Sequence, residues 1–181
     1  MNQLDEKNNI DKDNLDRVIF LREKVKNCVN KGLKLLRPAT VYETLEKSQV
    51  EKMSVKEHLR DELINGNVGL TVFVVTVGEG IDREISEEDK VGDVDAAKIL
   101  DIIGNMALYQ GVRFVKRLIS EEAQNENCSV ELWVDNLDNS IQQSLARFIQ
   151  LDKVGVKIKK SGGFSPSRSV LGLLKWTAIG D

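Results

Sequence analysis

One uninterrupted apolar run, Gly69–Gly78, constrains the fold more than any other feature of the chain. It reads GLTVFVVTVG, so β-branched and aromatic residues fill it and no charged residue interrupts it. This composition is typical of a strand that is covered on both faces, with a glycine marking each end. A transmembrane helix needs roughly 20 apolar residues, about twice this length, so the run favours a buried strand. The fold must therefore supply a layer on each side of that strand.

A helix is expected before this strand, from about Leu15 to Pro38. Its apolar residues recur at spacings of three and four, which places them on one face: Val18, Leu21, Val25, Cys28, Val29 and Leu36. Pro38 ends the helix, because the residue before a proline is pushed out of helical geometry. We expect a second helical stretch around Val41–Leu45 and then a charged segment. The first residues, 1–14, are expected to form a flexible polar tail.

Two helices are expected after the strand. A short one covers Ile81–Glu88, and a long one runs to about Ile119 with Asp93 as its N-cap, where a carboxylate accepts bonds from the first backbone amides. The long helix carries a wide apolar surface, which predicts a central, mostly buried position. Gly104 and Gly111 lie on one side of it, and each costs about 1 kcal/mol relative to alanine. They predict close approach by a strand or a ligand.

The C-terminal third alternates between strand and helix patterns. Val130–Val134 is an expected strand, and a helix opens at Asn139 or Ser140 with four apolar residues on its inner face: Ile141, Leu145, Phe148 and Ile149. Val154–Trp176 is expected to be a long hairpin that turns at the glycines after Ser161. Strands and helices therefore predict an α+β domain, with residues 15–181 forming a single unit.

Composition and charge exclude several classes of function. The 181 residues are 41% hydrophobic and 30% charged, with a formal net charge of −3. This balance offers no basic footprint for nucleic acid or for an anionic membrane. Cys28 and Cys128 are far apart and belong to no paired motif, which favours a reducing compartment. The polar start of the chain lacks the apolar core of a signal peptide, so we expect a cytoplasmic protein.

No self-contained catalytic or metal site is apparent in the sequence. His58 is the single histidine and lies in a charged stretch, without the spacing of a zinc site. Gly78 and Gly80 follow a strand as phosphate-binding glycines do, but without a third glycine or a loop lysine they favour a turn. Asp135 and Asp138 are expected to be surface carboxylates. Binding of a cofactor or a partner is therefore the expected mode of action.

Three stretches of the chain, taken in order, carry a resemblance to a known family. The first is the helix end and arginine–proline turn Leu35–Tyr42 (LLRPATVY). The second runs from Thr76 through a threonine–glycine turn and an aspartate–arginine pair to Gly104. The third joins the strand at Gly155 to a serine–glycine turn and the return Ser165–Gly172 (SPSRSVLG). In this order they resemble the activation domain of cobalamin-dependent methionine synthase, including stand-alone proteins built from that domain.

The resemblance implies a bent antiparallel sheet with flanking helices. It also implies a task, which in the family is to bind S-adenosylmethionine and present its methyl group for reductive remethylation of an inactivated cobalamin. The reactive chemistry there belongs to the corrinoid and to an electron donor such as flavodoxin. The chain would accordingly serve a separate cobalamin-dependent methyltransferase as an accessory domain, reaching cobalamin only through that partner.

The ligand motif of the family is replaced in this sequence. Before the helix at Asn139 the family carries an arginine, then serine or alanine, proline, glycine and tyrosine, which hold S-adenosylmethionine. This chain reads Glu131–Asn136 (ELWVDN), and Glu131 falls where the arginine would be. The change reverses the charge offered to the ligand's carboxylate, and unit charges about 4 Å apart near a surface interact by about 4 kcal/mol. Tyr109 stands in place of a glutamate expected on the long helix.

The resemblance leaves four candidate contacts and several alternatives. Arg168 and Ser169, in the return motif, are the expected surviving contacts to a ligand or partner; Glu131 and Tyr109 occupy the two altered positions. Alternatively, Arg168 and Ser169 only cap and solvate their strand.

The leading hypothesis is a stand-alone activation-domain homologue. A second is a degenerate homologue that has lost S-adenosylmethionine binding and acts as a scaffold or regulatory subunit. A third, an independent enzyme with an unrecognised site, rests only on the acidic clusters.

Overall fold

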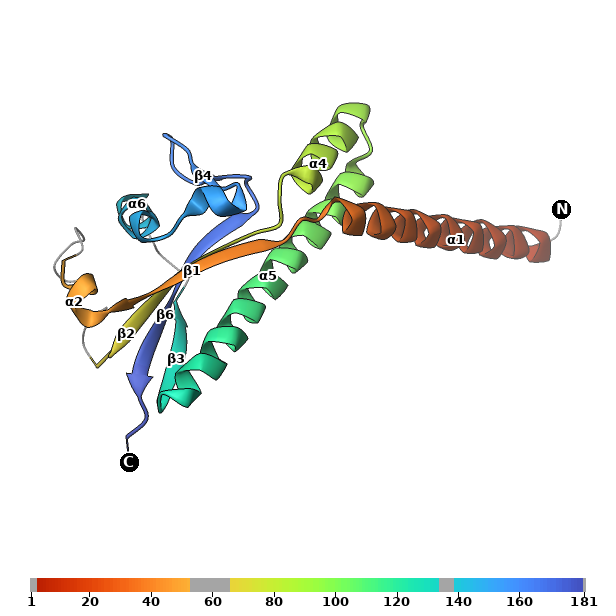
Figure 1. Cartoon of the computed structure of the whole chain (residues 1–181). Helices are drawn as coiled ribbons and strands as arrows, with labels where there is room; N and C mark the ends of the chain where they lie inside the picture. Colours follow the sequence, from red (N-terminus) through yellow and green to blue (C-terminus); the bar gives the residue numbers. More distant parts are fainter. Residues whose placement is uncertain (1–2, 53–65, 134–138, 181) are drawn as a thin grey trace.

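The computed structural model describes residues 3–52, 66–133 and 139–180, and it has the α+β fold that the sequence predicts (Figure 1). Four antiparallel strands form one sheet in the order β1 (Ala39–Glu46), β2 (Gly69–Thr76), β6 (Ser169–Ala178) and β3 (Cys128–Trp133). A separate two-stranded ribbon pairs β4 (Lys157–Ile158) with β5 (Phe164–Ser165).

Helices flank this sheet. They are α1 (Gln3–Leu35), α2 (Lys47–Val50), α4 (Gly80–Val91), α5 (Val94–Asn125) and α6 (Asn139–Leu145), with 3₁₀ turns at Ala146–Phe148 and Leu151–Val154. The predicted helices after Gly80 and after Asp93 are both present. Within the described part of the chain, none of the helices is long and apolar enough to span a membrane.

Strand β2 lies inside the sheet, and the prediction that it is covered on both faces is confirmed. Every residue after Gly69 in this strand is buried. It pairs with β1 along one edge and with β6 along the other, so Phe73 lies between Tyr42 and Gly172. Alternate side chains of a strand point to opposite faces, and accordingly Val72 and Phe73 belong to two different core clusters.

The sheet has a helical layer on one face and a mixed layer on the other. Phe73 and its neighbours on one face pack with Val115 and Ile119 of α5. The opposite face packs with Leu145 of α6 and with Phe164 of the ribbon. Figure 1 shows α5 running along one side of the strands, with α6 and the β4 region on the other.

Helix α1 projects away from this body (Figure 1). It begins at Gln3, so the expected start at Leu15 is too late and much of the expected tail is helical. Near its C-terminal end it packs closely on α5, where a Cβ added to Gly32 would lie 3.1 Å from Ile103 Cδ1. Lys31 forms ion pairs with two glutamates of α4, Glu84 and Glu88.

The expected helix around Val41–Leu45 is wrong, because these residues form strand β1. Thr40, Val41 and Tyr42 are β-branched or aromatic residues, which fit a pleated, half-buried surface. β1 pairs with β2 over its whole length, from Ala39 opposite Thr76 onward. The buried strand β2 needs a hydrogen-bonding neighbour on this edge, and that requirement outweighs the local apolar spacing.

The expected long hairpin over Val154–Trp176 is also wrong. β4 pairs with β5 in a short ribbon, whereas β6 lies between β2 and β3. The burial of the neighbours Leu173 and Leu174 gives the physical reason, because they point to opposite faces and both are fully buried. A strand covered in this way needs partners on both edges, which the polar segment around β4 cannot supply.

Helix α5 differs from its prediction in its end, which is at Asn125 and not at about Ile119, and in its burial. Its N-cap is confirmed, since Asp93 Oδ1 accepts a hydrogen bond of 3.0 Å from Ala96 N. However, Ile102 and Phe114 are exposed, so the helix is buried along one face and is not central. The approach by a strand is confirmed at Gly111, where an added Cβ would lie 2.5 Å from Val75 Cγ1 of strand β2. Gly104 is approached by the side chain of Arg168 and not by a strand.

Replacing Gly111 with alanine tests this contact. In an open helix the change gains about 1 kcal/mol, but here the added methyl group clashes with Val75, and overpacking costs about 1–3 kcal/mol. We expect Gly111→Ala to lower the free energy of unfolding in urea. In the double variant Gly111→Ala with Val75→Ala, the loss of unfolding free energy should be smaller than the sum of the losses in the two single variants. A Gly111→Ala protein that is more stable than the unchanged chain would contradict the packing.

Candidate functional site

Three turns that are far apart in the sequence meet at the upper end of the sheet. The backbone amide of Arg37, after α1, donates to the carbonyl of Val77, after β2, at 2.9 Å. The amide of Val77 in turn donates to the carbonyl of Arg168, before β6, at 3.2 Å. These residues belong to the three stretches that carry the family resemblance. We call their meeting point the junction.

Asp82 in the first turn of α4 holds the third stretch in place. Its Oδ2 atom accepts from Ser167 Oγ at 2.5 Å and from Ser167 N at 3.2 Å, with Arg168 N at 3.4 Å. A carboxylate near the N-terminus of a helix is also favoured by the helix dipole. Asp82 therefore fixes the turn before β6 onto α4.

Arg168 connects this turn to α5 as well. Its guanidinium forms ion pairs with Asp82 and with Asp101 of α5, while the side chain is only 12% exposed. It passes directly over Gly104, where an added Cβ would lie 2.5 Å from Arg168 Nε. Burial lowers the pKa of Arg168, but an arginine keeps its charge in a protein, so the two carboxylates are needed to balance it.

Ser169 belongs to a small buried network beside Arg168. Its hydroxyl donates to the carbonyl of Pro166 at 2.8 Å and lies 2.9 Å from Thr76 Oγ1. Thr76 Oγ1 also accepts from the amide of Gly78 at 3.1 Å. The network closes the turn after β2 onto the turn before β6, so Ser169 has a structural role at the junction.

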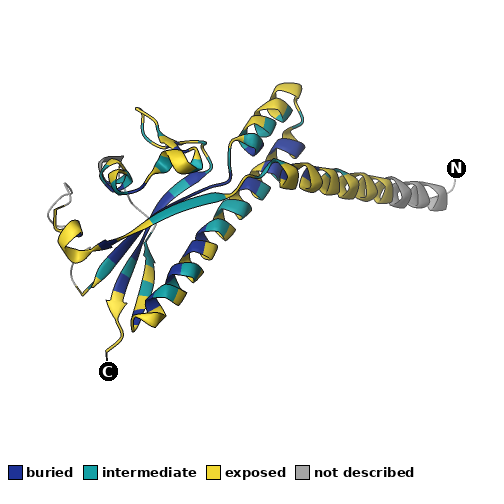
Figure 2. Ribbon diagram, in the orientation of Figure 1, coloured by how far each residue is buried: buried dark blue, intermediate teal, exposed yellow. Residues whose placement is uncertain are grey.

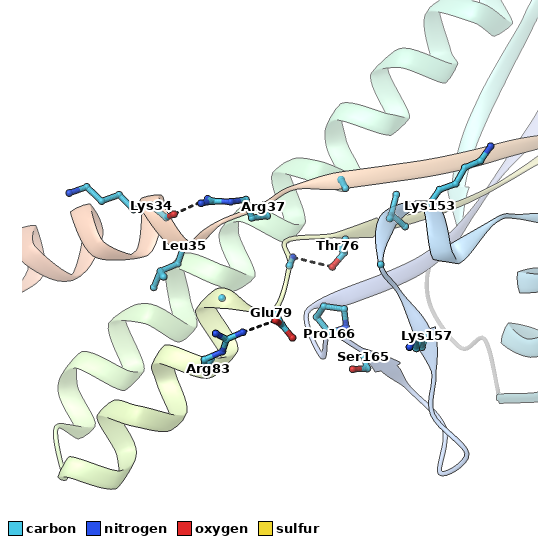
Figure 3. Close-up of a pocket in the computed structure, with 15 residues that line it drawn as sticks. Lys34, Leu35, Arg37, Thr76, Glu79, Arg83, Lys153, Lys157, Ser165 and Pro166 are labelled. Carbon is cyan, nitrogen blue, oxygen red and sulfur yellow. Dashed lines mark hydrogen bonds and ion pairs between the residues drawn. The ribbon is translucent and has the colours of Figure 1, made fainter.

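A cleft of about 690 Å³ opens at the junction (Figure 3). It lies between the end of α1, the start of α4 and the segments around β4 and β5. Five cationic residues and one acidic residue line it: Lys34, Arg37, Arg83, Lys153, Lys157 and Glu79. Arg83 is paired with Glu79 at 2.6 Å, and Arg37 donates to the carbonyls of Lys34 and Leu36 at 2.8 and 2.7 Å. We call this the basic cleft.

Glycines allow the chain to turn beneath the basic cleft. Gly78 has a φ of +81°, which side-chain-bearing residues rarely adopt. A Cβ on Gly80 would lie 2.7 Å from the carbonyl oxygen of Leu35, so only glycine fits there. Gly80 is also the first residue of α4, whose first amides have no partner within the helix. Unpaired amides and surrounding cations together suit an anionic group.

The structure does not bring the four predicted contacts together. Arg168 and Ser169 lie at the junction. Glu131 is exposed on β3, where it pairs across the sheet with Lys175 on the face opposite to α5. Tyr109 is exposed on the outer side of α5, with the Arg113 guanidinium 5.9 Å from its ring centre. Glu131 and Tyr109 are therefore on different sides of the molecule, and their role in ligand binding stays a prediction.

The cationic residues of the basic cleft escaped the sequence reasoning. The local signal for the cleft was the pair of glycines after the strand, Gly78 and Gly80, and the sequence favoured a turn for them. The cations that accompany these glycines come from distant segments, Lys34 from α1 and Lys157 from β4, so no local motif contains them. His58, Asp135 and Asp138 lie outside the described residues. Among the described residues, no group of three or more His, Cys, Asp or Glu side chains could hold a metal ion.

Comparisons with known proteins add no family assignment. No protein-family model matches the chain, and no curated protein matches it at a significant level. The basic cleft and the junction are therefore interpreted from their own chemistry. The cations that line the cleft suit the binding of an anionic group.

The buried arginine of the junction can be tested by unfolding. Arg168→Met leaves Asp82 without its cation in a site that is largely shielded from water, and breaking such a pair costs about 2–3 kcal/mol. Asp101→Asn should cost less than about 1 kcal/mol, because that carboxylate is 52% exposed. Urea unfolding followed by circular dichroism measures both. Equal effects of the two substitutions would contradict the central place of the Asp82–Arg168 pair.

Proposed function

We propose that the chain is an accessory domain of the methionine synthase activation type. It supports reductive remethylation of cobalamin on a separate corrinoid methyltransferase, in the cytoplasm, with the electrons coming from a flavodoxin-like donor. The domain itself makes and breaks no bonds. It positions S-adenosylmethionine and the partner, while the corrinoid carries the reactive chemistry.

The observation that carries this proposal is the junction. The three stretches that resemble the family are separated by long segments of chain, and yet they hydrogen-bond to one another through Arg37, Val77 and Arg168. A likeness that reflected only local helix and strand preferences would not require the stretches to touch. Their contact supports a shared architecture, in which the residues that resemble the family build one place in the fold.

The basic cleft beside the junction is the proposed ligand site. S-adenosylmethionine has a carboxylate, an ammonium group and a sulfonium group. Lys153 and Lys157 offer cations to the carboxylate, and Glu79 offers an acceptor to the ammonium group. In the family an arginine holds the carboxylate, and in this chain Glu131 on β3 takes the position of that arginine. We therefore propose that cations from another part of the fold, Lys153 and Lys157, bind the carboxylate instead.

A second function is favoured by the charge of the basic cleft and by Arg168. Five cationic residues against one acidic residue attract an anion more than a ligand with two positive groups. Arg168 is already paired with Asp82 and Asp101, so it has little capacity left for a ligand. Both observations support a homologue that has lost S-adenosylmethionine binding and holds its partner as a scaffold or regulatory subunit.

A remethylation assay tests the leading proposal. A purified corrinoid methionine synthase is inactivated, and a reductant and S-adenosylmethionine are added with or without the chain. We expect the chain to accelerate the return of the methylcobalamin absorbance spectrum. Lys153→Glu with Lys157→Glu should reduce this acceleration at least about tenfold, because charge reversal removes the attraction for the carboxylate.

A matched control separates the cleft from general charge effects. Lys159 and Lys160 are exposed beside β4 but do not line the basic cleft, so the double change to glutamate there should leave the acceleration intact. Equal losses in the two double variants would contradict the ligand site. A chain that binds the methyltransferase stably and yet gives no acceleration would support the scaffold function instead.

A further inference from the structure

Helix α1 carries a row of large apolar side chains that nothing in the described chain covers. Spacings of three and four residues place them along one face, and each is 36–60% exposed: Leu15, Val18, Leu21, Val25, Val29 and Leu33. We call this row the α1 stripe. Single exposed apolar residues are ordinary on a protein surface, but a contiguous row on a projecting helix indicates an interaction site. Figure 2 shows the exposed length of α1.

The α1 stripe runs beside a contact that already exists. At Cys28 and Gly32 the helix packs on α5 and is buried. Lys24 forms an ion pair with Asp93, the residue just before α5, at 2.6 Å. These contacts hold the root of α1, so its free face is presented in a fixed direction. A rigid helix of this kind loses little entropy when a second helix packs alongside it.

Cations border the α1 stripe. Arg22 shares the face of Val18 and Val25, because it lies four residues after one and three before the other. Arg17 lies one turn before Leu21, and Lys26 one turn after Arg22. Within the described part of the chain, none of these three cations forms an ion pair with an acidic side chain.

Several acidic residues nearby are already engaged by lysines. Lys31 pairs with Glu84 and Glu88, Lys90 with Glu87, and Lys24 with Asp93, whereas Asp89 of α4 is exposed without a lysine partner among the described residues. Between Leu15 and Leu33, the ends of the stripe, the acidic residues of α1 are Asp16 and Glu23, and they share the face of Phe20, away from the stripe. Among the described side chains, the stripe therefore combines apolar surface with cations that form no ion pair.

We infer that the α1 stripe docks an acidic amphipathic helix of a partner protein. Apolar residues of that helix would cover the row, and its flanking carboxylates would meet Arg17, Arg22 and Lys26, as flanking charges do in paired helices. A second copy of the chain is a poor occupant, because its own cations would face these. A membrane is also disfavoured, since the stripe has no aromatic residue and Phe20 lies on the opposite face. The inference concerns α1 alone and does not depend on what fills the basic cleft.

Binding of two synthetic peptides to the full chain tests the inference. Each labelled peptide has three heptads with leucine at the core positions, flanked in one by glutamate and in the other by lysine. Fluorescence anisotropy should show saturable binding of the acidic peptide and at least about tenfold weaker binding of the basic one. Val18→Glu with Val25→Glu should weaken binding of the acidic peptide at least about tenfold. Arg22→Glu with Lys26→Glu should reverse the preference between the peptides.

The matched control carries the same charges on the other face of the helix. Phe20→Glu with Asn27→Glu keeps the sequence spacing of the test pair and should leave binding of the acidic peptide within about twofold. Equal loss in both double variants, or no binding of the acidic peptide, would overturn the inference. Two further results would overturn it. One is a dimer in sedimentation that dissociates in Val18→Glu with Val25→Glu but not in the control variant. The other is binding of phosphatidylserine vesicles that the same stripe variant weakens and the control does not.

Discussion

The ion pair between Asp82 and Arg168 is the contact on which the arrangement of the junction depends. Asp82 accepts hydrogen bonds from Ser167 in the turn before β6. Arg168 forms ion pairs with Asp82 of α4 and with Asp101 of α5, and so connects the turn to both helices. A buried guanidinium is tolerated only when carboxylates balance it and the chain gives it space, and Gly104 provides that space. The turn after β2 bonds to the same segment, and the turn after α1 bonds to the turn after β2, so the pair orders both the end of the sheet and the walls of the basic cleft.

The sequence predicted the elements whose signals are local, and it failed where pairing partners decide the outcome. The apolar run of β2 and the N-cap at Asp93 follow from composition and local hydrogen bonding, and both are confirmed. The glycines of α5 correctly predicted close packing, although not that Arg168 and Val75 are the neighbours. Strand β1 was mistaken for a helix, because its register with β2 is a long-range property. The basic cleft was missed for the same reason, since its lysines come from separate segments.

The basic cleft and the α1 stripe offer two different kinds of recognition. The cleft presents cations around a helix start and suits a small ligand with a negative group. The stripe presents a long apolar row bordered by Arg17, Arg22 and Lys26 and suits an extended protein surface. An accessory domain needs both a place for its ligand and a way to reach the protein it serves. The two surfaces share no residue, so they are two separate places for a ligand and a partner.

A calorimetric titration of the purified chain with S-adenosylmethionine, repeated with S-adenosylhomocysteine, tests whether the cleft at the junction is a ligand site. We expect saturable heat with a dissociation constant in the micromolar range, about 8 kcal/mol of binding free energy. S-adenosylhomocysteine, which lacks the sulfonium charge but keeps the carboxylate, should bind to the same site. Absence of heat at millimolar concentrations of both ligands would contradict the claim and leave the scaffold function as the better description.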